Sequence, residues 1–188
     1  DHQWLRKRTP FEPSARVPML MYGHGLHDET LIPRGEVVDA PVELMDIMPT
    51  LLEIAGADVP ETVEGASLLP LVRGKRGGWR DYVHGECAMV PTADSGMQYL
   101  TDGRRKYVWW PGQGVEQFFD LEQDPDEMHD LAQEASRADE IARWRQRLIA
   151  ELTGRPEGFV ANGKLAKLDG PTPSLLPIFD EPAKAGAV

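Results

Sequence analysis

The stretch MQYLTDGRRKYVWW, residues 97–110, predicts a β-hairpin. Its two halves, 97–101 and 106–110, are rich in aromatic and branched side chains, which favour extended strands. Between them stands Asp102-Gly103, and an Asp-Gly link is typical of tight hairpin turns because both residue types tolerate positive φ. We therefore expect a small antiparallel sheet built around this hairpin.

Two further strands are expected beside the hairpin, at residues 82–87 and 117–121. The Gly- and Pro-containing run 111–114 can turn the chain into the last of them. A helix that ends at Gly154 follows, and its apolar side chains recur at helical spacing on one face: Ile141, Trp144, Leu148 and Leu152. We expect this face to cover the sheet.

The first part of the chain, residues 1–74, has a different pattern. The apolar run 17–22, which a glycine follows, predicts a strand buried on both faces of a parallel sheet. Apolar side chains then recur at helical spacing between Asp39, the expected N-cap, and Gly56, the expected stop. Pro49 should kink this helix or split it into a short turn and a second helix.

Composition changes mark the expected boundaries. A polar, glycine-rich link at 75–78 separates residues 1–74, the α/β part, from a small α+β subdomain at 79–153. Residues 154–188 are rich in Gly and Pro and predict an extended tail that lies over a surface. The chain opens with Asp1 rather than Met, and we expect it to be part of a longer protein.

Composition also excludes several function classes. The formal net charge of −11 disfavours nucleic acids and anionic membrane surfaces as partners. The single cysteine, Cys87, excludes an internal disulfide framework and a zinc site with several cysteine ligands. No apolar run approaches the roughly 20 residues that cross a bilayer. The composition leaves open whether the protein works in the cytoplasm or the periplasm.

Five groups of residues resemble the sulfatase family, in the family's own order. They are the opening D-H…K…A-R-V-P at 1–18, D-I-M-P-T-L-L-E-I-A-G at 46–56, G-A-S-L-L-P-L at 65–71, K-Y-V with E-Q-F-F-D-L at 106–121, and D-P-D-E…D-L-A at 124–132. The resemblance covers residues 1–153. It implies the last part of an alkaline-phosphatase-like α/β sulfatase domain, followed by a small α+β C-terminal subdomain of about four antiparallel strands and one helix.

The resemblance also implies an activity, the hydrolysis of sulfate esters. In the intact enzyme it implies a formylglycine nucleophile and a divalent cation, usually calcium. The family's C-x-P-x-R signature is absent here, and Cys87 stands in G-E-C-A-M-V-P, so we expect a half-buried thiol on a strand rather than the nucleophile. We expect this chain alone to bind no cofactor and to be inactive.

The same resemblance implies three site residues. Lys7 matches the lysine that contacts the sulfate, and its ammonium group offers a point charge with three donors; without the resemblance it would be an exposed lysine in a basic run. His2 belongs to a second Asp-His pair that lines the active site; Gln3, where the metal-binding pair has Gly, excludes Asp1-His2 as the metal ligands. His84 is the candidate for substrate contact.

Other functions and several partners stay open. The chain could belong to a phosphoester or phosphonate hydrolase of the same superfamily, or be a non-catalytic binding or assembly module. The expected substrate is a sulfated small molecule or a sulfated sugar. An exposed strand edge at 17–22 would need a missing N-terminal catalytic part or a second copy of the chain as its cover.

Overall fold

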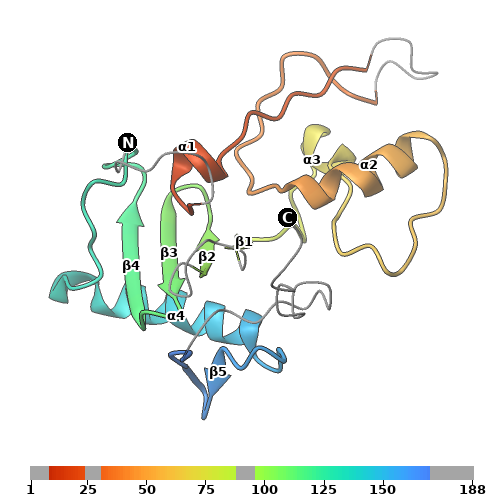
Figure 1. Cartoon of the computed structure of the whole chain (residues 1–188). Helices are drawn as coiled ribbons and strands as arrows, with labels where there is room; N and C mark the ends of the chain where they lie inside the picture. Colours follow the sequence, from red (N-terminus) through yellow and green to blue (C-terminus); the bar gives the residue numbers. More distant parts are fainter. Residues whose placement is uncertain (1–8, 24–30, 88–95, 170–188) are drawn as a thin grey trace, which may run out of the picture. The chain divides into compact units, whose positions relative to one another are not determined.

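The computed structural model describes residues 9–23, 31–87 and 96–169 (Figure 1). The chain forms two compact units, and we describe each by itself. The first, which we call the sheet unit, combines residues 9–16 with those from His84 onward, and the second, the helical unit, is Val17–Val83. None of the helices in the described ranges combines the length and the apolar character needed to cross a bilayer.

A four-stranded sheet is the centre of the sheet unit, as the sequence predicts. Its strands are ordered as they occur along the chain, β1-β2-β3-β4. They are β1 (Val83–Cys87), β2 (Met97–Thr101), β3 (Arg105–Trp110) and β4 (Val115–Asp120). The pairs β2/β3 and β3/β4 are antiparallel, and Trp109 stands opposite both Gln98 and Glu116.

Two turns fix the register of this sheet. At the first, Gly103 adopts φ 84°, and the Asp102 carboxylate accepts hydrogen bonds from the backbone N–H groups of Arg104 and Arg105 at 2.8 and 2.7 Å. At the second, Gly114 has φ 69° and donates its N–H to the Trp110 carbonyl at 2.8 Å. Both are positions that glycine occupies without strain, and both turns are confirmed predictions.

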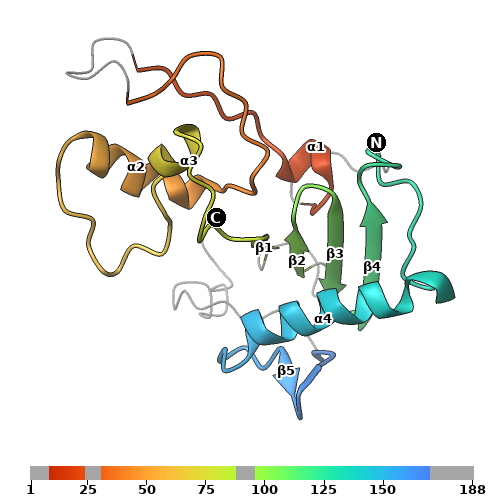
Figure 2. The same cartoon turned by 180° about the vertical axis from the view of Figure 1, so that it is seen from behind.

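The two faces of the sheet pack against different segments. One face carries a cluster with Phe11 from the segment before the short helix α1 (Glu12–Ala15), and its members are Phe11, Met97, Val108, Trp110, Phe119 and Leu121. The helix α4 (Ala138–Leu152), which the 3₁₀ turn η2 (Ala135–Arg137) precedes, covers the other face (Figure 2). Its buried side chains include the four that the sequence predicts to face the sheet, Ile141, Trp144, Leu148 and Leu152.

A small hairpin follows α4 in the region for which the sequence predicts an extended tail. It consists of β5 (Val160–Ala161) and β6 (Lys164–Leu165), with Phe159 buried at its base. Two backbone hydrogen bonds hold the hairpin, from Ala166 N–H to the Phe159 carbonyl at 2.8 Å and from Leu168 N–H to the Pro111 carbonyl at 3.0 Å. Residues 154–169 therefore contribute structure to the sheet unit.

The helical unit contains the predicted helix in two pieces. A 3₁₀ turn, η1 (Leu44–Asp46), leads into α2 (Ile47–Ile54), and α3 (Leu69–Val72) follows. Pro49 lies in the first turn of α2, where a missing N–H costs nothing, which explains the predicted split. The prediction of Asp39 as the N-cap is wrong, because a capping box between Glu43 and Asp46 begins the helical segment.

A buried carboxylate organises this unit. Asp46 is fully buried and pairs through both oxygens with Arg80, at 2.8 and 2.6 Å, while one oxygen also accepts the Ala66 N–H at 2.9 Å. Next to it, the Thr50 hydroxyl donates to the Asp46 carbonyl and accepts the Leu68 N–H. The loop before α3 is thereby fastened to α2 by polar contacts.

The predicted buried strand at 17–22 is wrong. This segment has no regular structure, and Leu20 and Tyr22 are 95% and 72% exposed. A strand requires a neighbour to satisfy its backbone groups, and in the described part of the chain no strand pairs with it. The apolar composition alone therefore does not produce the strand.

Candidate functional site

The segment after the predicted site residues is anchored in the sheet unit. Lys7 and His2 themselves lie outside the described residues, and their roles stay predictions. From Thr9 onward the chain is described, and Thr9 and Phe11 are both buried. The Phe11 ring meets Phe119 of β4 edge to face, with ring centroids 5.9 Å apart. The chain is therefore fixed to the sheet at Phe11, four residues after Lys7.

A buried cluster of charges strengthens this anchor. Lys106 of β3 is fully buried, and its Nζ donates to Glu12 Oε1 at 2.8 Å and to Glu127 Oε1 at 2.7 Å. The second oxygen of Glu127 accepts the backbone N–H of Glu12 at 2.6 Å. Three parts of the sequence, α1, β3 and the turn after β4, thus meet at one ammonium group. Because a buried charge is costly unless paired, removing any member should loosen the anchor.

The turn that supplies Glu127 is built for this contact. Glu127 has φ 54°, a left-handed backbone conformation that is uncommon for residues other than glycine. Its N–H donates to the Asp124 carbonyl at 3.0 Å, and the Asp124 carboxylate accepts the His129 N–H at 2.7 Å. The left-handed residue aims its carboxylate into the sheet unit, and its side chain is fully buried. Strain of this kind persists only where surrounding contacts hold it.

His84, the third predicted site residue, is described and lies half-buried on β1. Its Nε2 is 2.8 Å from the side-chain oxygen of Gln98, whose amide nitrogen donates to Glu86 at 3.1 Å. Since the Gln98 amide nitrogen is engaged by Glu86, its oxygen faces the imidazole, and Nε2 of His84 must donate. This network assigns the proton of the neutral ring to Nε2 and leaves Nδ1 as an acceptor.

Ion pairs hold the outer end of the His84 network. Arg155, which follows α4, donates to Glu86 at 2.8 Å and also pairs with Glu157. The hydrogen bonds that Arg155 donates to Glu157 and Glu86 raise the pKa of its guanidinium, although partial burial opposes this. The sequence predicts His84 on a strand, but its partners Gln98 and Glu86 could not be found from the sequence, because no local pattern links them.

The described residues contain no group of side chains that could hold a metal ion. Within residues 9–23, 31–87 and 96–169, no three His, Cys, Asp or Glu side chains are grouped so that they could hold a metal ion. Cys87 is a half-buried thiol at the end of β1, in no disulfide, and packs against the Phe11 cluster. This confirms its predicted place on a strand. The formylglycine and calcium implied for the intact enzyme therefore do not fit this set of residues.

Comparisons with known proteins agree on one family. Residues 1–153 match the family described as N-sulphoglucosamine sulphohydrolase, C-terminal. An arylsulfatase of Clostridium perfringens is 41% identical over 169 residues, which cover 89% of this chain and 34% of that protein. The chain thus spans about a third of the length of this relative.

Solved structures of a sulfatase and of a phosphonate hydrolase are similar to part of this chain. A 2-O GAG sulfatase aligns with a TM-score of 0.58 and 26% identity, over 66% of this chain and 28% of its own. A phosphonate monoester hydrolase from Silicibacter pomeroyi aligns with a TM-score of 0.55 and 27% identity, over 64% of this chain and 27% of its own. The similarity therefore concerns one part of much longer proteins.

Proposed function

Because the chain belongs to the sulfatase family and matches its C-terminal part, we propose that it acts as the C-terminal part of a sulfuric ester hydrolase. The match of the family model over residues 1–153 is the observation that carries this proposal. The Clostridium arylsulfatase and the 2-O GAG sulfatase support it. A sulfated small molecule or sulfated sugar is the substrate class that we propose.

The role of this part is to place Lys7 at the sulfate. The contacts of Phe11 with Phe119 and of Glu12 with Lys106 fix the chain four and five residues after Lys7. A lysine at the active site can direct its ammonium group at the non-bridging oxygens, where negative charge shifts in the transition state. His2 would line the same site, and His84, with Nδ1 as an acceptor, would contact a hydroxyl group of the substrate.

The nucleophile and the cation would come from the part of the relatives that this chain does not span. When bound, a divalent cation would neutralise charge on the sulfate oxygens. The described residues offer no ligand set for it. We expect the 188-residue chain alone to show no turnover of p-nitrophenyl sulfate, with or without calcium.

A chimera tests the proposal. This chain replaces the matching third of the Clostridium arylsulfatase, and hydrolysis of p-nitrophenyl sulfate is measured. We expect activity, and Lys7→Ala should reduce kcat by about 10²- to 10³-fold, as loss of one transition-state donor does. Lys75→Ala, a control in the exposed link, should leave kcat unchanged. An active chimera in which both variants behave alike would refute the role of Lys7.

The similarity to the phosphonate monoester hydrolase favours a second candidate function. The chain would then serve an enzyme that cleaves phosphonate esters. Grafting it in place of the matching quarter of the Silicibacter enzyme and assaying p-nitrophenyl phenylphosphonate separates the two. If this graft regains activity and the arylsulfatase chimera does not, the phosphonate function replaces the sulfatase function.

A further inference from the structure

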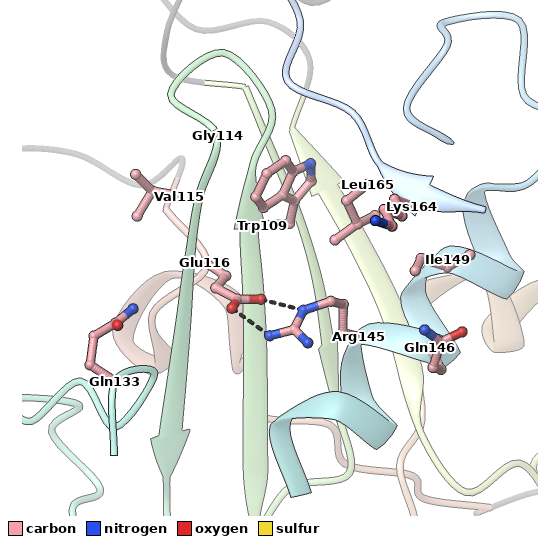
Figure 3. A pocket seen from close by; sticks show the side chains of 10 residues that line it. All are labelled: Trp109, Gly114, Val115, Glu116, Gln133, Arg145, Gln146, Ile149, Lys164 and Leu165. Atoms are coloured by element: carbon pink, nitrogen blue, oxygen red, sulfur yellow. Dashed lines mark hydrogen bonds and ion pairs between the residues drawn. The ribbon is translucent and has the colours of Figure 1, made fainter. Parts of the chain in front are cut away.

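A depression of about 560 Å³ lies between β3, β4, α4 and β6 (Figure 3). Trp109, Ile149 and Leu165 form its apolar part, and Arg145, Gln146 and Lys164 are among its polar lining residues. It belongs to the face of the sheet that α4 covers. The Phe11 cluster and Lys106 occupy the opposite face, because side chains alternate along a strand. This depression is therefore separate from the anchor of the Lys7 segment.

The charges at its base form a neutral, fixed group. Arg145 donates through Nε and Nη2 to the two oxygens of Glu116, at 2.8 and 2.5 Å (Figure 3). The Tyr107 hydroxyl donates to Glu116 at 2.6 Å, and burial together with this carboxylate raises the pKa of the phenol. Tyr107 thus stays a donor at neutral pH. Glu116 engages one edge of the guanidinium, which leaves Nη1 for a further partner.

Two more cations stand at the rim. Lys164 is exposed, and no carboxylate among the described residues pairs with it. The aliphatic part of the Lys167 side chain packs against Gly114. A Cβ atom added at Gly114 would lie 3.1 Å from Lys167 Cδ. Glu116 is the single carboxylate among the lining residues, and Arg145 already neutralises it. The depression is therefore locally positive, although the net charge of the chain is −11.

The side chain of Trp109 supplies an independent sign of a ligand. It is 7% exposed, and its Nε1 has no hydrogen-bond partner in the described part of the chain. Buried indole N–H groups usually find an acceptor, and one that is left unpaired destabilises the fold. Figure 3 shows the indole nitrogen on the side of Leu165, the residue of β6 that borders the depression.

We propose that this depression binds a sugar unit that carries a sulfate or carboxylate group. The oxyanion pairs with Arg145 Nη1 and Lys164, whose positive charges suit either group. The ring packs on the apolar part, and a hydroxyl group accepts the Trp109 N–H once the Leu165 side chain moves aside. The volume falls in the range of small-ligand sites, about 300–1,000 Å³. The proposal requires no catalysis and stands apart from the proposed function.

NMR on the ¹⁵N-labelled 188-residue chain tests it. Loss of one indole signal in Trp109→Phe assigns Trp109, and galactose 6-sulfate, glucuronic acid, glucose and sodium sulfate are titrated in turn. We expect saturable shifts of the Trp109 signal with the two anionic sugars. Lys164→Gln should weaken both affinities about fivefold, as loss of one partly exposed charge contact does. Lys75→Gln, in the exposed link, should leave them unchanged.

Several outcomes would overturn the proposal. If sodium sulfate alone binds as tightly as galactose 6-sulfate, the site takes a free anion and not a sugar. If glucose binds as tightly, the cations play no part. If no probe moves the Trp109 signal in a chain whose other indole signals show a folded protein, the depression binds none of these ligands.

Discussion

The two units differ in how well they bury their own apolar side chains. In the sheet unit, Leu100, Phe118 and Leu148 have no exposed surface. In the helical unit, the segment of η1 and α2 exposes Leu44 to 63% and Leu51 to 59%, and Met45, Ile47 and Met48 are exposed too. The difference arises because α4 and the Phe11 segment cover both faces of the sheet, whereas α2 buries only Pro49 and Thr50.

This comparison indicates which unit supplies the stability of the chain and which unit offers a surface for association. The sheet unit has the packed core that a stable domain needs. The helical unit presents neighbouring apolar side chains on one short helix, which is typical of an interaction surface. The sequence analysis expects either a missing N-terminal catalytic part or a second copy of the chain as a partner, and both stay predictions. The edge at 17–22 is no strand, so α2 is the better candidate for that contact.

The largest effect is expected at the buried ammonium group. Lys106→Met removes the cation that joins Glu12 to Glu127 and leaves the buried Glu127 carboxylate without its cation. We expect the free energy of unfolding of the sheet unit to fall by about 3–5 kcal/mol, measured by urea denaturation with tryptophan fluorescence. Lys75→Met, in the exposed link, is the control and should change it little.

A triple variant separates lost pairing from lost packing. Adding Glu12→Gln and Glu127→Gln to Lys106→Met removes both carboxylate charges that faced the ammonium group, so much of the stability should return. A Lys106→Met chain as stable as the control would show that the cluster does not anchor the segment. If the triple variant is no more stable than Lys106→Met, the loss of stability comes from lost packing and not from lost pairing.

A matched pair of leucines tests the comparison directly. Leu148→Ala opens a cavity under α4, where the side chain is 0% exposed, and should cost about 2–5 kcal/mol. Leu51→Ala trims a side chain that is 59% exposed and should cost under about 0.5 kcal/mol. Thermal unfolding of both variants supplies the measurement. If Leu51→Ala costs as much as Leu148→Ala, the face of α2 is covered in solution and the comparison fails.

The sequence predicts the parts of the fold that depend on local patterns. The strands of the sheet and helix α4 follow from periodicities of two and 3.6 residues, and the Asp102-Gly103 turn from the conformations these residues tolerate. The run 17–22 misleads because an apolar composition indicates burial only where a neighbouring strand is present. The hairpin at 160–165 is not predicted, because strands of two residues are too short to show an alternation of apolar and polar side chains.

The candidate site is less predictable from sequence. Lys7, His2 and His84 come from a family resemblance, and that resemblance, unlike their roles, is confirmed. Lys106 gives no local signal of burial, because its partners stand 94 and 21 residues away. The orphan N–H of Trp109 likewise appears only when α4 and β6 are placed over the sheet. Contacts between segments that lie far apart in the sequence could not be predicted from the sequence.

The smallest expected effect is the pH dependence of Glu116. Burial alone would raise the pKa of this carboxyl group, but hydrogen bonds from Arg145 and Tyr107 outweigh it and hold the pKa below its ordinary value. A pKa lowered by folding means that the pair stabilises the fold above the unfolded-state pKa and loses this contribution as pH falls through the folded-state pKa. Glu116→Gln should therefore cost about 1 kcal/mol at pH 7, with the difference from the unchanged protein shrinking below about pH 4. Glu134→Gln, an exposed control outside any described ion pair, should show no such trend in urea denaturation. A difference that grows on acidification would reverse the sign of the linkage and refute the role assigned to the Arg145 pair.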